Sequence, residues 1–138
     1  MFPDMDLSGA KFVDLPVVSD VRGNLAVAEN GALPFAVARV YWLYDVPSGS
    51  VRGGHAHRSN QQILVALSGS FDVVLDDGKT RTTTTLNRPD RGLYIPTGVW
   101  RELENFSAGA VCLALASEPY DESEYVRDYD AFKASANR

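Results

Sequence analysis

The sequence contains very few of the residues from which disulfide frameworks and metal sites are built. Among its 138 residues there are one cysteine and two histidines. A single cysteine cannot form an internal disulfide, which excludes a disulfide-stabilised scaffold and fits a reducing compartment. Cys112 lies in the apolar stretch of residues 110–116, so we expect a small buried side chain there rather than a catalytic thiol. No apolar run approaches the roughly 20 residues that a membrane-spanning helix needs.

Positive charge is also scarce. The chain has 13 lysines and arginines against 18 acidic residues, a net charge of −5. This balance argues against binding to nucleic acid or to anionic membranes. Residues 1–6 carry aspartate where a secretory signal peptide would carry base, so we expect a cytoplasmic protein. A pocket on an acidic protein can still be basic, and the arginines that could build one for a phosphorylated small molecule are Arg22, Arg39, Arg52, Arg58, Arg91 and Arg101.

Short extended segments separated by turn residues run through most of the chain. They are rich in β-branched and aromatic residues, and Asp77-Gly78 is a strong signal for a tight hairpin. The predicted strands are residues 37–44, 63–67, 71–75, 80–86, 92–95, 99–106 and 110–116. No internal repeat or linker interrupts them. The pattern therefore predicts one all-β domain over residues 1–138, an antiparallel barrel.

The two ends of the chain differ from this pattern. Residues 121–136 are polar and acidic, with Tyr125, Tyr129 and Phe132 at spacings of four and three. This spacing predicts one or two short amphipathic helices whose aromatic side chains anchor them to the barrel. Residues 13–29 are typical of one or two edge strands around the turn at residues 19–24. An extended N-terminal strand could pair with the sheet edge of a second subunit.

The two histidines stand two residues apart, so in an extended segment their side chains point to the same face. Such a pair alone is usually an exposed feature of a loop, but here its neighbours are regularly spaced. The spacing resembles the first cupin motif, with glutamine in place of glutamate, in Gly49-x5-His55-Ala56-His57-x4-Gln62-x6-Gly69. It resembles the second motif, with arginine in place of histidine, in Pro96-x-Gly98-x2-Arg101-x3-Asn105. Together the motifs predict a cupin jelly-roll barrel.

The two replacements bear directly on metal binding. Metal-binding cupins use three histidines and a glutamate as ligands, whereas this chain has Gln62 and Arg101 at two of those four positions. Arginine stays protonated and cannot ligate a cation, and an amide is a weak ligand for transition metals. The two histidines that remain are too few for a zinc or iron site. We therefore expect no metal and no other cofactor.

Two histidines without a metal are suited to proton transfer, because imidazole titrates near neutral pH. Arg101 beside them would supply a fixed positive charge for an enolate or enediolate oxygen. Arg39 and Tyr41 share one face of a predicted strand and could point into the same cavity. The Tyr41 hydroxyl could donate to the developing oxyanion, or Tyr41 could simply pack in the core with its hydroxyl at the rim.

Read with its flanking residues, the chain resembles the dTDP-sugar 3,4-ketoisomerases, cupin enzymes of deoxysugar biosynthesis. The most distinctive matches are Arg52-Gly53-Gly54-His55-Ala56-His57 and Tyr120-Asp121-Glu122 followed by Tyr125-Val126-Arg127. Further matches run along nearly the whole chain and include Asp20-x-Arg22-Gly23-Asn24-Leu25, Arg39-Val40-Tyr41, Gly92-Leu93-Tyr94-Ile95-Pro96, Trp100-Arg101-Glu102 and Asn105-Phe106-Ser107. Family members often have histidine where this chain has Arg101.

The resemblance implies a metal-independent tautomerisation of dTDP-4-keto-6-deoxyglucose, in which the carbonyl moves from C4 to C3. Two neighbouring histidines can divide this work, one at carbon and one at oxygen. Either could be the base at carbon, and we favour His57 with His55 as its partner and Tyr41 as support for the oxygens. The resemblance also implies a homodimer with exchanged N-terminal strands. For the nucleotide diphosphate we expect Arg39 and Arg52, since arginine grips phosphate in bidentate fashion.

Other residues are expected to contact the remaining parts of the substrate. Tyr94 or Trp100 could stack on thymine, and Gln62 and Arg101 are expected to contact the substrate. Two other functions stay open at this point. One is a sugar-nucleotide 3,5-epimerase, also a cupin that uses histidine, and the other is a non-catalytic cupin that binds sugar nucleotides.

Overall fold

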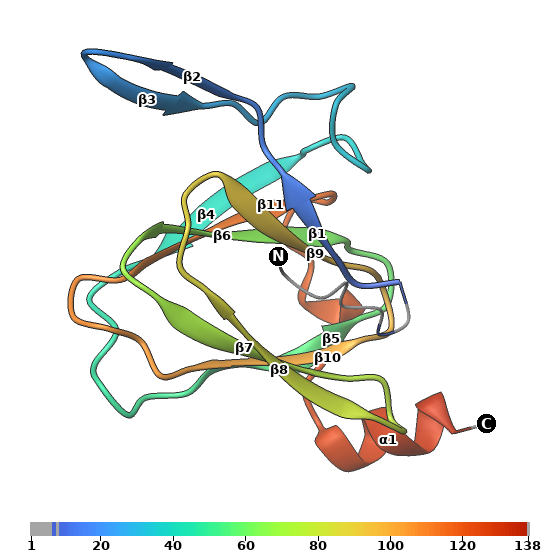
Figure 1. Ribbon diagram of the computed structural model, residues 1–138. Coiled ribbons are helices and arrows are strands. Elements are labelled where there is room, and N and C mark those ends of the chain that lie inside the picture. The colour runs from blue at the N-terminus through green and yellow to red at the C-terminus, as the bar shows by residue number, and fades with distance from the viewer. Residues whose placement is uncertain (1–6, 8, 138) are drawn as a thin grey trace.

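The computed structural model describes Leu7 and residues 9–137, so the acidic residues 1–6, which suggested a cytoplasmic location, lie outside the described residues. Within the described part, two five-stranded antiparallel sheets face one another (Figure 1), in the orders β1-β9-β6-β11-β4 and β12-β5-β10-β7-β8. The strands of the first sheet are β1 Lys11–Asp14, β9 Arg91–Ile95, β6 Gln62–Ser68, β11 Val111–Ala116 and β4 Arg39–Leu43. Those of the second are β12 Tyr125–Val126, β5 Arg52–His57, β10 Trp100–Glu104, β7 Phe71–Asp76 and β8 Arg81–Leu86.

The core lies between the two sheets. Alternate residues of each strand point inward, and the main apolar cluster joins Leu64 and Leu93 of the first sheet to Val73, Leu75 and Leu103 of the second. The first sheet is also covered on its outer face, where Ile63 and Val65 pack with Leu15, Phe35 and Leu115. This double burial explains why β6 is a nearly continuous apolar run rather than an alternating one.

The prediction of an all-β cupin-type fold with short C-terminal helices is confirmed, with one correction to its closure. Among the described strands no hydrogen-bonded ladder joins one sheet to the other, so the sheets form a sandwich rather than a closed barrel. Closure needs paired edges, and here β1 and β4 end one sheet while β12 and β8 end the other. The predicted strands lie within two residues of the observed ends.

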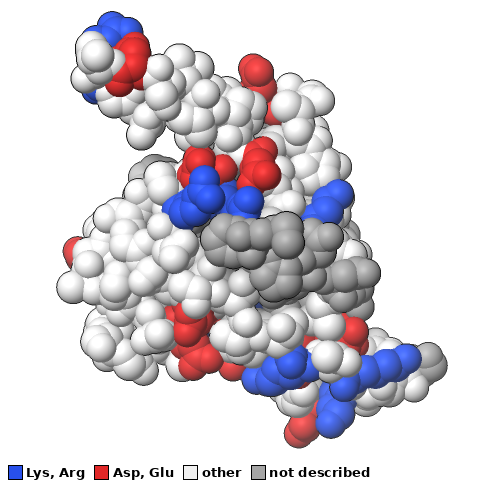
Figure 2. All heavy atoms as spheres, viewed as in Figure 1, with Lys and Arg blue, Asp and Glu red and all other residues white. Residues whose placement is uncertain are grey.

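The N-terminal region forms a hairpin that stands away from the sandwich (Figure 1). Strands β2, Val17–Asp20, and β3, Gly23–Ala26, pair with each other, and all of their residues are exposed. Figure 2 shows the hollow between this hairpin and the body, with charged side chains at the hairpin tip. Of the three described N-terminal strands, only β1, which overlaps the start of the predicted edge segment 13–29, joins one of the two large sheets, where it pairs with β9.

The C-terminal region covers the second sheet. The 3-10 helix η1, Glu122–Glu124, leads into β12, and the helix α1, Tyr129–Ala136, begins at the N-cap Asp128. The predicted anchoring by Tyr129 and Phe132 is confirmed, since their rings pack on Trp100. Of the helices described, none has the length and apolar character to cross a membrane.

Candidate active site

The two histidines lie side by side on β5, as the alternation of the strand requires. Their Nε2 atoms are 3.1 Å apart and their ring planes meet at 80°. His55 is 9% exposed, whereas the His57 side chain has no exposure. The two imidazoles therefore form a hydrogen-bonded pair on the inner face of the second sheet.

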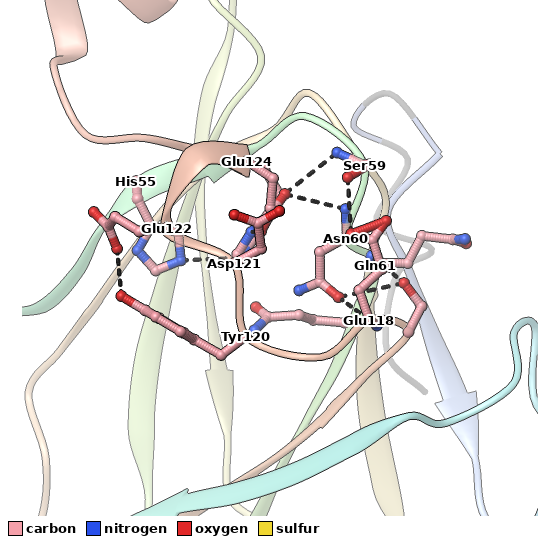
Figure 3. Close-up of polar contacts among 12 residues, drawn as sticks. His55, Ser59, Asn60, Gln61, Glu118, Tyr120, Asp121, Glu122 and Glu124 are labelled. Carbon is pink, nitrogen blue, oxygen red and sulfur yellow. Dashed lines mark hydrogen bonds and ion pairs between the residues drawn. The ribbon is translucent and has the colours of Figure 1, made fainter.

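Glu124 completes this pair and was missed by the sequence prediction. Its Oε1 lies against Nδ1 of His57, and its Oε2 accepts the backbone N–H groups of Ser59 and Asn60 at 3.3 and 3.2 Å (Figure 3). The residue is only 6% exposed. Strand β12 places it there, because Tyr125 pairs with His57 and the carbonyl of Glu124 accepts from the N–H of Arg58. Three glutamates in the acidic segment 118–124 look alike in the sequence, so only this pairing distinguishes Glu124.

Hydrogen bonding sets the tautomer of each imidazole. A carboxylate can only accept, so Nδ1 of His57 carries the proton and its Nε2 presents a lone pair. His55 then donates from Nε2 to that lone pair across the 3.1 Å contact. Tyr125 lies against both rings, with centroids 4.9 Å from His55 and 4.5 Å from His57. The arrangement leaves His57 as a base whose opposite nitrogen is held by a carboxylate.

Both imidazoles are neutral at neutral pH. Burial and then the nearby Arg101 lower the pKa of His55 to about 3 and that of His57 to about 2. The Glu124 carboxylate acts in the opposite direction on His57, because a carboxylate in contact with Nδ1–H stabilises the imidazolium. The contact at Nδ1 thus gives an imidazolium at His57 a carboxylate partner that His55 lacks.

The buried histidines make stability depend on pH. In the unfolded chain they titrate near 6.5, well above the lowered pKa values of the folded protein, so unfolding takes up protons below pH 6.5. The free energy of unfolding should then fall as pH falls, by up to about 1.4 kcal/mol per pH unit for each histidine. In urea unfolding at pH 7, 6 and 5, we expect the intact protein to lose roughly 4 kcal/mol more than His55→Asn/His57→Asn between pH 7 and pH 5. Equal losses in the two proteins would contradict the neutral buried pair.

A cavity of about 80 Å³ lies beside the pair, between the two sheets. Five of the predicted site residues line it: Tyr41, Arg52, His55, Gln62 and Arg101. Cys112 borders its apolar end and is buried, and burial raises the pKa of its thiol to about 12. A catalytic thiolate is thus disfavoured, as the sequence predicts.

Arg39 lies next to this cavity. Its guanidinium stacks between Tyr41 and Tyr120, with centroid distances of 5.4 and 5.6 Å. Its Nε and Nη2, like Nε of Arg101, are buried N–H groups that have no hydrogen-bond partner within the described chain. Buried donors are normally paired, so a cluster of unpaired ones indicates a place where a ligand supplies acceptors. Oxygen-rich groups such as phosphates or an oxyanion fit these donors.

The structure does not bring Tyr94 or Trp100 to the cavity. Trp100 precedes Arg101 on β10, and neighbours on a strand point to opposite faces, so its ring packs under α1 while Arg101 points inward. Tyr94 lies on the outer face of the first sheet, where its ring meets Phe35 and its hydroxyl donates to Gln61 Oε1. Within the described chain, neither ring presents a face to the histidines.

The donor set of the site is unfavourable for a metal. Within the described residues, no three histidine, cysteine, aspartate or glutamate side chains converge as ligands. Glu124 meets His57 at Nδ1, on the side of the ring opposite to the His55 contact, and the guanidinium of Arg101 is held close to the pair. The absence of a cofactor remains a prediction, but the residues present do not fit a cation.

Comparisons with known proteins place the chain among sugar-nucleotide isomerases. The model of the family "FdtA: WxcM-like, C-terminal" matches residues 8–137. The TDP-4-oxo-6-deoxy-alpha-D-glucose-3,4-oxoisomerase of Aneurinibacillus thermoaerophilus is 44% identical over 124 residues, which cover 89% of each chain.

Two solved structures are similar over nearly their whole length. The TDP-quinovose 3,4-ketoisomerase WlaRB of Campylobacter jejuni has 44% identity and a TM-score of 0.88, with 93% of this chain and 99% of that chain covered. A mutant of the 3,4-ketoisomerase QdtA of Thermoanaerobacterium thermosaccharolyticum, in complex with TDP-4-keto-6-deoxyglucose, has 35% identity and a TM-score of 0.93, with 96% of each covered. Because the family match spans residues 8–137 and identity reaches 44% over most of both chains, the protein belongs to the FdtA family, WxcM-like, C-terminal.

Proposed function

We propose that the protein is a 3,4-ketoisomerase that converts dTDP-4-keto-6-deoxyglucose into a dTDP-3-keto-6-deoxyhexose. The observation that carries this proposal is the buried unit of His55, His57 and Glu124 beside a cavity with a tyrosine hydroxyl and two arginines. Such a unit can remove and return a proton without a metal. Relatives of 44% and 35% identity that carry this activity or bind this ligand support the choice of substrate.

The reaction requires one proton to move between carbons and one between oxygens. The proton on C3 is acidified by the C4 ketone, and its removal gives an enediolate. The histidine pair takes this proton, which comes to rest on His57, where Glu124 stabilises the imidazolium. A proton then returns at C4, the O3–H proton passes to O4, and the carbonyl is left at C3. No oxidant or reductant is consumed.

The charged groups around the cavity fit the rest of the substrate. Arg101 is held within the cavity wall, where its positive charge favours the enediolate oxygens. The pKa of Arg101 is lowered by burial to about 10, so it stays charged at neutral pH. Arg52 at the cavity and the unpaired donors of Arg39 suit the diphosphate.

The position of the carbonyl in the product tests this function. The protein is incubated with dTDP-4-keto-6-deoxyglucose, and ¹³C NMR follows the carbonyl carbon. We expect the carbonyl to appear at C3, with the same result after treatment with a chelator. A carbonyl that stays at C4 while C3 or C5 inverts would make the protein an epimerase. Tight binding with no change in the ligand would make it a binding cupin.

We further propose a homodimer in which the β2–β3 hairpin packs against a second copy of the chain. A two-stranded hairpin is marginally stable by itself, yet this one exposes Val17, Val18 and Leu25 by 41, 62 and 58%. Strand β4 is a sheet edge and exposes Val40 and Trp42 by 47 and 56%. Exposed apolar residues on a projecting hairpin and on a sheet edge are complementary, so exchange of hairpins would cover both.

Charges on the hairpin should therefore separate the subunits. Val18 and Leu25 lie opposite each other on β2 and β3, and Val18→Glu/Leu25→Glu places two carboxylates on that surface. In light scattering after size exclusion, we expect a dimer for the intact chain and a monomer for this variant. Val51→Glu, at a valine 57% exposed outside the hairpin, is the matched control and should stay dimeric. A monomeric intact chain, or a dimeric hairpin variant, would contradict the exchange.

A further inference from the structure

Two hydrogen bonds link β10 through β6 to β4 in the cavity wall, and a third holds the guanidinium of Arg101 locally. Arg101 donates from Nη2 to the carbonyl of Val99 at 2.8 Å and from Nη1 to Oε1 of Gln62 at 2.7 Å. Gln62 donates from Nε2 to the hydroxyl oxygen of Tyr41 at 2.6 Å. Gln62 and Arg101 are each 1% exposed, so this chain of contacts is shielded from water.

The direction of these bonds is fixed by chemistry. A guanidinium has only donors, so the Gln62 atom that faces Arg101 must be the acceptor Oε1. The planar amide then turns Nε2, which can only donate, toward Tyr41. The Tyr41 oxygen has to accept, and its own proton cannot point at Gln62. Because Tyr41 lines the cavity, its proton is free to point into the cavity.

We propose that Arg101 and Gln62 are positioning residues that hold Tyr41 as a hydrogen-bond donor to the substrate oxygen that becomes negative in the enediolate. This inference rests on the proposed ketoisomerase function. It assigns a role to the two positions where the cupin motifs would carry metal ligands. Both heteroatoms of the Gln62 amide are already engaged with protein, which favours orientation over direct contact with the sugar.

Two further observations agree with this role for Tyr41. Burial raises the pKa of its hydroxyl, so the proton needed for donation is present at neutral pH. The guanidinium carbon of Arg39 lies over the Tyr41 ring, 5.4 Å from its centroid, and packs against the ring. A donor that is already aimed costs no reorganisation when the oxyanion forms, which is how preorganised donors accelerate such reactions.

We call the hydrogen bonds from Arg101 through Gln62 to Tyr41 the relay. Gln62→Glu tests it because the substitution preserves the shape of the side chain and reverses the direction of its hydrogen bond with Tyr41. A carboxylate keeps the contact with Arg101 but can only accept, so the Tyr41 proton would turn toward it and away from the cavity. We expect Gln62→Glu and Tyr41→Phe each to lower kcat by roughly 10- to 100-fold, with KM within about threefold. The double variant should be no more than about twofold slower than Tyr41→Phe, because both changes remove the same donor.

Gln61→Glu is the matched control, since it makes the same change at the next residue, whose amide faces Tyr94 instead. It should keep kcat within about twofold of the intact protein. Independent, multiplicative losses in the double variant, or unchanged turnover in Gln62→Glu, would overturn the relay.

A second measurement separates failure of the relay from failure of the proposed function. If the intact protein leaves the carbonyl at C4, the function is wrong, and the relay is judged without substrate by ¹³Cζ-tyrosine NMR. Donation from Gln62 stabilises the phenolate, so Gln62→Glu should raise the pKa of Tyr41 by about one pH unit or more. The control Gln61→Glu should leave it unchanged. An unchanged Tyr41 pKa in Gln62→Glu would overturn the relay whatever the activity.

Discussion

His57→Asn is expected to lower turnover of dTDP-4-keto-6-deoxyglucose by about 10³-fold, because a general base in this position contributes roughly 10²- to 10⁴-fold. Asparagine fills most of the space of the fully buried ring but cannot take up a proton. We expect the circular dichroism spectrum to be unchanged and the Kd for TDP to stay within about threefold, so the loss falls on kcat. Turnover within tenfold of the intact protein would contradict the mechanism.

His55→Asn provides the comparison that separates the two histidines. Removal of the His55 ring opens the side of His57 that carries the lone pair. We therefore expect this variant to exchange the C3 proton of the substrate with solvent deuterium while product formation drops sharply. His57→Asn should show neither exchange nor product. If instead only His55→Asn abolishes exchange at C3, the base at carbon is His55.

Glu124→Gln is expected to lower kcat by about 10²- to 10³-fold through the tautomer of His57. The amide oxygen can still accept from Ser59 and Asn60, but the NH₂ group would then face Nδ1 of His57. Nδ1 would have to accept, and the proton would move to Nε2, where the lone pair is needed. KM should change little, because Glu124 does not line the cavity.

The tautomer can be observed directly, because the chain has two histidines and its ¹⁵N imidazole spectrum is correspondingly simple. We expect His57 to be protonated at Nδ1 in the intact protein and at Nε2 in Glu124→Gln. Glu118→Gln is the matched control, since Glu118 bonds the Ser59 hydroxyl but no imidazole. It should leave the tautomer and kcat unchanged. The Nδ1–H tautomer persisting in Glu124→Gln together with a full loss of kcat would show that Glu124 acts in another way.

Much of the fold follows from local patterns in the sequence. The Asp77-Gly78 turn joins β7 to β8 as predicted, and His55 and His57 share a face because side chains on a strand alternate. The sequence could not show that the predicted barrel is an open sandwich, because closure depends on whether distant edge strands such as β4 and β8 pair. The isolation of the β2–β3 hairpin likewise depends on what lies beside it in space.

In the active site, too, some features follow from local sequence patterns and others depend on distant contacts. Alternation on β10 already implies that Trp100 and Arg101 point to opposite faces, so the sequence could have excluded one of them from the cavity. Glu124 could not be found in this way. Its approach to His57 depends on β12 pairing with β5, a contact between residues 67 apart in a segment whose composition is typical of a solvated surface.

Turnover in D₂O tests the central claim, proton transfer by the histidine unit, most directly. The intact protein, treated with a chelator, is incubated with dTDP-4-keto-6-deoxyglucose, and ¹H and ¹³C NMR locate deuterium and carbonyl. We predict a product with its carbonyl at C3 and deuterium at C4, deuterium at C3 of the recovered substrate, and none of these in His57→Asn. A carbonyl that remains at C4, or full activity that disappears only on chelation, would contradict the account.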